Sequence, residues 1–217
     1  SDISDFMMKD KLDVKWTTSG ITIFSYKMMS SELKNKIVKS GCDSFRFGVE
    51  TANPRMIKLI DKPNTKQDIF EVNKDTKKHG IIPIYSFMAG FPTETKEQFQ
   101  DSLDLIEKIK PDVINISKFV ARKGTEAYKM EQVQGEEIKN RSRLLTSIFD
   151  WTGYGVNKKW LKWEGTALVD EIGKEGTVMA RNNAYKPIVI KGDHKLGERI
   201  KVRIIDATKH YLIGEKI

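Results

Sequence analysis

Cysteine is almost absent from this 217-residue sequence, and its scarcity excludes a disulfide-stabilised fold. Cys42 is the only cysteine, so a reducing cytoplasm is the expected compartment. No apolar run approaches the roughly 18 residues of a membrane span, so we expect no membrane partner. The first residues, SDISDFMMKDKLDVKW, have no apolar core behind a basic flank, so we do not expect them to be a signal peptide. They also lack an initiator Met, so we expect the chain to be cut from something longer.

Metal-ligand and common catalytic patterns are missing as well. The three histidines, at positions 79, 194 and 210, are scattered and lack ligand spacing, so we expect no metal site. The sequence has no P-loop, no Ser/His/Asp set and no Cys/His set, so it offers no residue that we assign to catalysis. Cys42 follows Gly41 at a predicted helix end, where a small buried residue is expected.

Positive charge is in excess and unevenly distributed. The chain has 38 Lys and Arg against 30 Asp and Glu, and a net charge of +8. Residues 152–217 hold 13 Lys and Arg against eight Asp and Glu, whereas the first 151 residues carry only +3. A basic protein permits a polyanionic partner, although many basic proteins bind no nucleic acid. The charge therefore favours RNA only modestly, and for the last third of the chain.

Residues 1–150 alternate short apolar runs with longer amphipathic stretches, a pattern that predicts an α/β domain. The predicted strands are 45–49, 81–88 and 113–120, and the predicted helices are 31–39, 53–60, 65–78, 93–110 and 135–150. The nearly all-apolar run 81–88 is typical of a strand covered on both faces. A closed (β/α)8 barrel needs about 250 residues, so we expect a partial barrel or a small open parallel sheet.

Residues 151–217 have a different pattern of apolar and polar residues. Strands that alternate apolar and polar residues are separated by Gly173-Lys174, Asn182-Asn183 and Gly192-Asp193. Turn residues at intervals of about 8 to 12 positions are typical of small antiparallel barrels. The chain is therefore predicted to hold two domains, 1–150 and 151–217.

The stretch YSFMAGFPTET, residues 85–95, ends an apolar strand in a turn. Gly90 has no Cβ and permits close approach of a ligand, Pro92 fixes the turn, and Thr93 is suited to cap the next helix. Glu94 suits the first turn of that helix. This pattern fits a plain strand-to-helix turn, and equally a ligand-binding edge at the C-terminal end of a parallel strand.

Two further strand ends have comparable features. In FRFGVETANP, Glu50 ends the strand, and its carboxylate can accept two hydrogen bonds from a ribose diol or simply be solvated. In ISKFVARKGTEAYKM, Lys118, Arg122 and Lys123 precede Gly124-Thr125, and these charges are suited to a carboxylate or phosphate or to plain solvation.

The last domain contains a stretch that suits RNA. RNNAYKPIVI, residues 181–190, combines basic residues with an Asn-Asn turn and Tyr185, which fits phosphate contacts and base stacking. A plain hairpin with a polar tip fits the same residues.

Together these stretches resemble the radical S-adenosylmethionine enzymes. FGVETANPRMIKLIDKPNT is similar to their fourth-strand region, and YSFMAGFPTET to their GxIxGxxE-type fifth-strand motif. From position 111 onward, PDVINISKFVARKGTEAYKM, EEIKNRSRLL, GKEGTVMARNNAYKPIVI and HYLIG resemble archaeal and eukaryotic tRNA methylthiotransferases, with a terminal RNA-binding TRAM domain. Those enzymes add a methylthio group to C2 of N6-threonylcarbamoyladenosine beside the anticodon, through a 5′-deoxyadenosyl radical and sulfur from an auxiliary cluster.

The resemblance implies the ligands and their residues. S-adenosylmethionine would be the cofactor, with Glu50 near its ribose, Met88, Gly90 and Phe91 along its adenine, and Arg122 and Thr125 near the pocket rim. The TRAM-like domain would hold tRNA. Its expected RNA contacts are Lys174, Arg181, Asn182, Asn183, Tyr185 and Lys186.

The sequence departs from that family in two ways. The CxxxCxxC that binds the catalytic [4Fe–4S] cluster is absent, since one cysteine cannot hold a cluster, and so is the N-terminal methylthiotransferase domain. The chain is therefore expected to be a C-terminal portion, inactive alone, whose partners include the missing N-terminal domains. Residues 14–110 also resemble cobalamin-binding radical enzymes, so a fragment of such an enzyme stays open, as does a non-catalytic RNA-binding protein.

Overall fold

The computed structural model describes residues 2–217, with only the backbone of residue 152. The chain divides into two compact units, Ser1–Phe149 and Asp150–Ile217. No helix in the described part of the chain is both long and apolar enough to cross a membrane.

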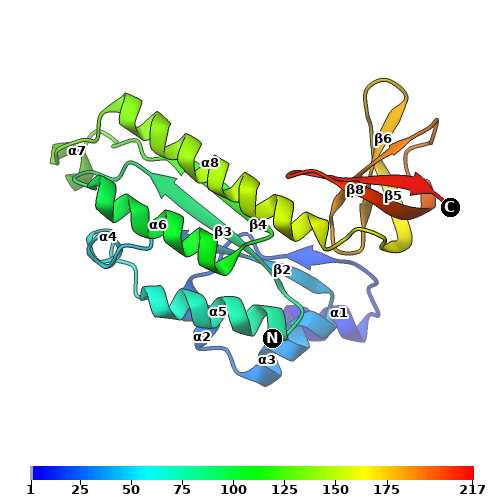
Figure 1. Ribbon diagram of the computed structural model, residues 1–217. Coiled ribbons are helices and arrows are strands. Elements are labelled where there is room, and N and C mark those ends of the chain that lie inside the picture. Colours follow the sequence, from blue (N-terminus) through cyan, green and yellow to red (C-terminus); the bar gives the residue numbers. More distant parts are fainter. Residues whose placement is uncertain (1) are drawn as a thin grey trace. The chain divides into compact units, whose positions relative to one another are not determined.

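The first unit is built on a parallel sheet of four strands in the order β1-β2-β3-β4, which confirms the predicted α/β fold (Figure 1). The strands are β1 (Trp16–Thr17), β2 (Cys42–Glu50), β3 (Ile82–Ala89) and β4 (Val113–Lys118). The helices are α1 (Asp2–Lys9), α2 (Ile23–Lys27), α3 (Ser31–Lys39), α4 (Pro54–Leu59), α5 (Lys66–Lys78), α6 (Lys96–Ile109), α7 (Glu126–Lys129) and α8 (Gly135–Lys158). The residues of α8 from Asp150 onward belong to the second unit. Crossover helices between neighbouring parallel strands make this unit half of a (β/α) barrel.

The hydrophobic core lies on one face of the sheet. Fully buried aromatic rings pack edge-on there, with centroids of Tyr26 5.6 Å from Phe45 and 5.5 Å from Phe47. Along β3 burial alternates: Tyr85 and Phe87 are buried, whereas Ser86 and Met88 are half-buried. The expectation that this strand is covered on both faces is therefore wrong, because helices cover one face and the other is left partly open within this unit.

Helix starts follow the capping residues of the sequence, with one shift. The Asn53 side chain accepts hydrogen bonds from the backbone N–H groups of Arg55 and Met56 at the start of α4. For α6 the cap is Thr95, which forms a reciprocal capping box with Gln98. The expected cap, Thr93, instead has a φ of +61° and lies in the preceding turn. The capping box selects Thr95 because Gln98 stands three residues after it.

The second unit is a closed barrel in the order β5-β6-β7-β9-β8. Its strands are β5 (Glu164–Ile172), β6 (Thr177–Asn182), β7 (Pro187–Lys191), β8 (Arg199–Ala207) and β9 (Leu212–Lys216). The predicted small barrel is confirmed, but it is mixed: among the described strands, four pairings are antiparallel, and β7 pairs with β9 in parallel. Alternate residues of these strands fill its interior, including Ala180, Ile188 and Val202.

Candidate functional site

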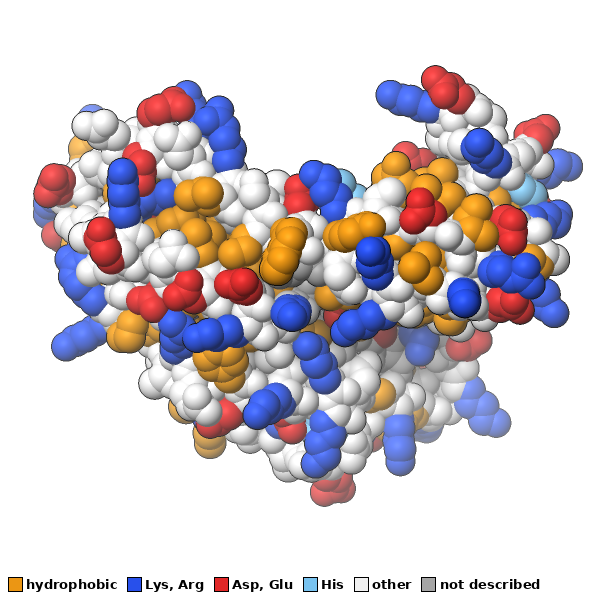
Figure 2. Space-filling model, in the orientation of Figure 1, with side chains coloured by type: hydrophobic (Ala, Val, Ile, Leu, Met, Phe, Trp, Pro, Cys, Tyr) orange, Lys and Arg blue, Asp and Glu red, His pale blue; other side chains and the backbone are white. Residues whose placement is uncertain are grey.

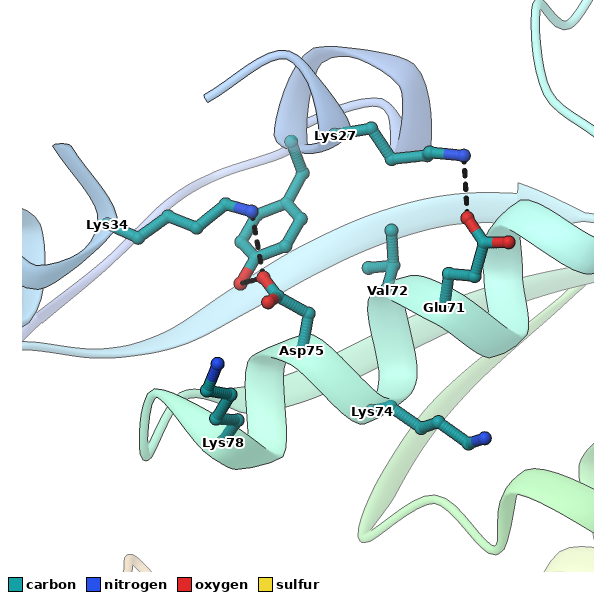
Figure 3. Close-up of a pocket in the computed structure, with 8 residues that line it drawn as sticks. Lys27, Lys34, Glu71, Val72, Lys74, Asp75 and Lys78 are labelled. Atoms are coloured by element: carbon teal, nitrogen blue, oxygen red, sulfur yellow. Dashed lines mark hydrogen bonds and ion pairs between the residues drawn. The ribbon is translucent and has the colours of Figure 1, made fainter. Parts of the chain in front are cut away.

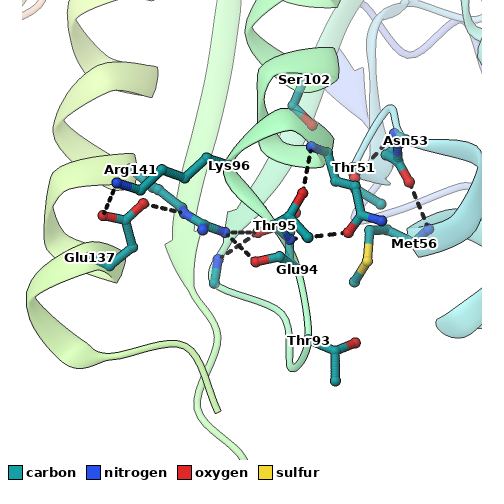
Figure 4. Close-up of polar contacts among 12 residues, drawn as sticks. Thr51, Asn53, Met56, Thr93, Glu94, Thr95, Lys96, Ser102, Glu137 and Arg141 are labelled. Carbon is teal, nitrogen blue, oxygen red and sulfur yellow. Dashed lines mark hydrogen bonds and ion pairs between the residues drawn. The ribbon is translucent and has the colours of Figure 1, made fainter. Parts of the chain in front are cut away.

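The turn after β3 is held by a buried ion pair. The Glu94 side chain accepts a hydrogen bond from the Gly90 backbone N–H at 3.2 Å and one from Arg141 Nη1 at 2.9 Å. Arg141 also donates to the Glu94 carbonyl oxygen and, through Nε, to Glu137 Oε1 (Figure 4). Glu94 is 4% exposed and Arg141 3%. Burial raises the pKa of Glu94, and the nearby Arg141 guanidinium opposes that rise.

Gly90 needs its glycine identity. Its φ is +87°, and a Cβ at this position would lie 2.5 Å from Cγ1 of Ile138 on α8. The glycine thus lets α8 approach the turn closely, while its N–H is engaged by Glu94. As a candidate adenine contact, Gly90 offers its remaining backbone surface and not a free N–H.

Glu50 stands at the end of β2 in a strained backbone conformation. Its φ is +65°, and a register shift between Gly48 and Glu50 interrupts the pairing with β3. Lys62 Nζ lies 3.8 Å from Glu50 Oε1 and donates to the Gly48 carbonyl oxygen at 3.0 Å. Burial raises the pKa of Glu50, and Lys62 partly offsets the rise. A partly exposed carboxylate next to a cation at a parallel strand end is a suitable hydrogen-bond acceptor for a ligand.

The other predicted cofactor residues are placed differently. Met88 is half-buried on the open side of β3. Phe91 is 4% exposed and packs against Phe119, with ring centroids 5.3 Å apart, so it belongs to the packing of the turn. Arg122 and Thr125 are exposed in the loop after β4, where the Thr125 hydroxyl donates to the Arg122 carbonyl oxygen at 2.7 Å. Their contact with a cofactor stays a prediction.

In the second unit, the half-buried Arg181 and the exposed Tyr185 form a pair that suits RNA. The Arg181 guanidinium lies 5.0 Å from the centroid of the Tyr185 ring, and its Nε donates to Asp170 Oδ2 at 2.6 Å. Tyr185 is 69% exposed, with a φ of +60°. A presented aromatic face backed by a cation is a stacking platform for a base. Asn183 is exposed in the same turn as Tyr185, between β6 and β7, whereas Lys174 is exposed in the turn between β5 and β6, at the other end of β6.

The side chains of Asn182 and Lys186 form hydrogen bonds within the second unit, at the same hairpin. Asn182 is 5% exposed, and its side-chain oxygen accepts hydrogen bonds from the backbone N–H groups of Ala184 and Lys186. Lys186 Nζ donates to Asn157 Oδ1 at 3.2 Å. These bonds shape the turn that presents Tyr185, and RNA contact by either residue stays a prediction.

A separate pocket of about 410 Å³ lies among α2, α3 and α5 (Figure 3). Its acidic side chains are paired, since Asp75 accepts hydrogen bonds from Lys34 and from the Tyr26 hydroxyl, and Glu71 accepts one from Lys27. The opposite charges within each pair neutralise one another, and the pairs connect α2 and α3 to α5. This pocket lies away from the strand ends, so it is not the candidate site.

No group of three or more His, Cys, Asp or Glu side chains within the described residues is arranged to hold a metal ion. Cys42 is buried, as the sequence predicted, and burial raises the pKa of its thiol to about 11. A buried, protonated thiol on its own cannot hold an iron–sulfur cluster. The residues present therefore do not fit the cluster.

Sequence reasoning missed two residues of this site. Arg141 lies 47 positions from Glu94, on a helix that local patterns describe only as amphipathic. Lys62 follows Asp61 in a loop, and nothing local points to its position beside Glu50. The one available signal was Glu94, a glutamate in a turn next to an apolar strand. A carboxylate buried there requires a cationic or hydrogen-bonding partner, although the sequence does not say which residue supplies it.

Lys and Arg side chains are scattered over the face drawn in Figure 2, with Asp and Glu between them.

Comparison with known proteins finds a matching family for each of the two units. Residues 4–106 match the radical SAM superfamily, and residues 164–217 match the TRAM domain. The probable threonylcarbamoyladenosine tRNA methylthiotransferase of Archaeoglobus fulgidus is 34% identical over 169 residues, covering 77% of this chain and 39% of that protein. The Pyrococcus horikoshii protein of the same description is 39% identical over 130 residues, or 60% of this chain and 30% of that protein. The chain thus spans less than half the length of these relatives.

Solved structures agree on the fold. Coproporphyrinogen III oxidase from Escherichia coli, a radical SAM enzyme, aligns with a TM-score of 0.59 at 11% identity over 94% of this chain and 50% of that one. An N-terminally truncated Elp3 from Methanocaldococcus infernus aligns with a TM-score of 0.50 at 13% identity, over 90% of this chain and 58% of that one. The chain accordingly combines a radical SAM domain with a TRAM domain and is a homologue of the threonylcarbamoyladenosine tRNA methylthiotransferases.

Proposed function

We propose that this chain supplies the cofactor edge and the RNA-binding domain of a tRNA methylthiotransferase, which adds a methylthio group to C2 of N6-threonylcarbamoyladenosine beside the anticodon. One observation carries the proposal: two kinds of domain occur in one chain. A parallel half-barrel has a carboxylate at a strand end, and a closed basic barrel presents Tyr185 against the Arg181 guanidinium. Similarity to methylthiotransferases over both units supports it.

S-adenosylmethionine fits the strand ends in this proposal. Glu50 would accept hydrogen bonds from the ribose hydroxyls, since its carboxylate is partly exposed with Lys62 3.8 Å away. Met88 would lie along the adenine from the neighbouring strand. The bound cofactor supplies the radical chemistry of the family. Residues of this chain would hold and orient it.

The catalytic [4Fe–4S] cluster and the auxiliary cluster need ligands that these 217 residues do not contain, because Cys42 is the only cysteine. We propose that those ligands come from the N-terminal domains found in methylthiotransferases, which would be partners in one polypeptide. The chain by itself is then expected to bind its ligands and to be inactive.

The test of this function is tRNA binding by the whole chain, measured by filter binding at several salt concentrations. The affinity should fall steeply with salt, with a slope of about −0.7 to −0.9 per neutralised phosphate. The variant Arg181→Ala/Tyr185→Ala should bind about tenfold more weakly, because a stacked base and a cation are lost. Arg199→Ala/Tyr154→Ala is a matched control from the same unit. Indifference to tRNA at low salt would contradict the proposal.

A non-catalytic RNA-binding protein is the second candidate, and the lone cysteine favours it for the chain as it stands. In that case the first unit is scaffold and binds no S-adenosylmethionine. A fragment of a cobalamin-dependent radical enzyme is the third. The basic RNA-type barrel argues against it, because enzymes acting on small molecules have less need of such a domain.

A further inference from the structure

A cavity of about 470 Å³ lies in the first unit, between α4 and the start of α5. Three lysines line it, Lys58, Lys62 and Lys66, against a single acid, Asp61. Lys62 also approaches Glu50, so the cavity adjoins the strand end described above. Among the side chains that line the cavity, cations therefore outnumber anions.

The lysines are only partly neutralised. Lys66 Nζ pairs with Asp101 Oδ1 at 2.8 Å, and Lys62 lies 3.8 Å from Glu50. Lys58 forms no ion pair with any residue that the structure describes. A compact anion can therefore be held here by at least one uncommitted ammonium group.

Asn64 gives a second and independent indication of a ligand. It lines the same cavity and is 6% exposed, yet neither polar atom of its carboxamide has a hydrogen-bond partner within the described chain. Buried polar groups in native proteins are almost always hydrogen-bonded, and an unpaired one costs stability. An amide NH₂ here is a ready donor to an anion.

The start of α5 adds backbone donors. Lys66 and Gln67 open this 13-residue helix and line the cavity. The Thr65 side chain caps the N–H of Asp68, which leaves the first helical N–H groups directed out of the helix end. Such helix ends favour anions, although Asp68 already places one carboxylate in this turn, bonded to Lys27 and Thr65.

We propose that this cavity is a phosphate-binding site that takes a backbone phosphate of the RNA substrate, as a second RNA contact apart from the TRAM domain. The inference rests on the proposed function for the identity of the ligand. Cations, a free amide and a helix end together supply the donors that a phosphodiester requires. One phosphate fixed beside Glu50 would orient the RNA relative to the cofactor edge.

The first experiment probes the site with inorganic phosphate and the full chain, followed by amide NMR. Phosphate should shift the backbone amide signals of Lys66 and Gln67, and these shifts should be lost in Asn64→Ala/Lys58→Ala. The control Lys74→Ala/Lys78→Ala removes two lysines from later turns of the same helix and should keep the shifts. Absence of shifts in the unmodified chain overturns the proposal.

The second experiment measures tRNA binding by the same proteins. Asn64→Ala/Lys58→Ala should weaken binding about tenfold and flatten the salt slope by about 1, whereas the lysine control should match the unmodified chain. If phosphate shifts the amides but the tRNA affinity of the variant is unchanged, the RNA assignment is overturned while the proposed function stands. If the unmodified chain binds no tRNA at all, both fail.

Discussion

At the scale of single residues, the Glu94–Arg141 pair explains why a glutamate follows Gly-Phe-Pro-Thr. Glu94 reaches back to the Gly90 N–H and across to Arg141, so one carboxylate closes the turn and attaches α8 to it. Its other oxygen, Oε1, has no partner within the described residues. The pair fixes the turn at the cost of burying a charge, as buried ion pairs generally do.

Removing the Arg141 side chain should therefore destabilise the protein strongly. Arg141→Ala leaves the Glu94 carboxylate buried without its cation and is expected to lower the free energy of unfolding by about 3–5 kcal/mol. Arg143→Ala, two residues further on the same helix and 71% exposed, should change it by less than about 0.5 kcal/mol. Urea denaturation of both variants is the measurement. Equal effects of the two substitutions would contradict the assignment.

Asp75 gives a prediction about acid stability. Burial acts to raise the pKa of its carboxyl, but hydrogen bonds from Lys34 and Tyr26 outweigh burial and hold the pKa below its ordinary value. The stability from this carboxylate is thus present above the ordinary pKa of an aspartate and is lost as the pH falls through the lower folded-state value. Asp75→Asn should be less stable than the unmodified chain at pH 7, and this difference should shrink in acid.

The measurement for Asp75 is thermal unfolding between pH 7 and pH 2. Asp104→Asn serves as the control, because that carboxylate accepts a hydrogen bond from the Gln100 amide and has no cationic partner within the described residues. A difference between Asp75→Asn and the unmodified chain that stays constant down to pH 2 would show that the ion pair with Lys34 contributes nothing.

At the scale of elements, the start of α6 shows what local sequence can decide. Thr93 and Thr95 are both acceptable caps, and the choice depends on which has a Glu or Gln three residues later. Thr95→Ala should lower the free energy of unfolding by about 1 kcal/mol. Thr93→Ala, which removes an exposed hydrogen bond from Arg55, should cost less. Chemical denaturation of both variants checks the order, and the reverse order would contradict the assigned cap.

The longer strands and helices were predictable from periodicity, as β3, α5 and α6 show, because apolar spacing reports local geometry. The short elements β1, α2 and α7, and the terminal helix α1, were not predicted. Contacts between distant elements were not. The burial of only one side of β3 depends on which helices cover the sheet, and Arg141 reaches Glu94 from 47 residues away. Likewise the parallel β7–β9 pairing depends on barrel closure, which no single strand pattern encodes.

At the scale of the whole molecule, one chain holds two units for which we propose different ligands. The half-barrel presents the Glu50 and Met88 strand ends, and the barrel of residues 164–217 presents Arg181 and Tyr185. A cofactor edge without cluster ligands and an RNA-binding domain are the parts expected of the C-terminal portion of a methylthiotransferase. The alternative, an RNA-binding protein with an inert scaffold, differs from this account at one point, the binding of S-adenosylmethionine.

Equilibrium dialysis of S-adenosylmethionine against the full chain at pH 7.5 tests that point most directly. Burial raises the pKa of Glu50 and the nearby Lys62 opposes that rise, so the dialysis is repeated at a higher pH, where the ionised acceptor is favoured. The account predicts that the chain binds S-adenosylmethionine and that Glu50→Gln weakens this binding about tenfold, because a charge-assisted hydrogen bond is lost. The control Glu107→Gln, on the exposed side of α6, should leave the binding unchanged. A chain that binds tRNA but no S-adenosylmethionine would contradict the account.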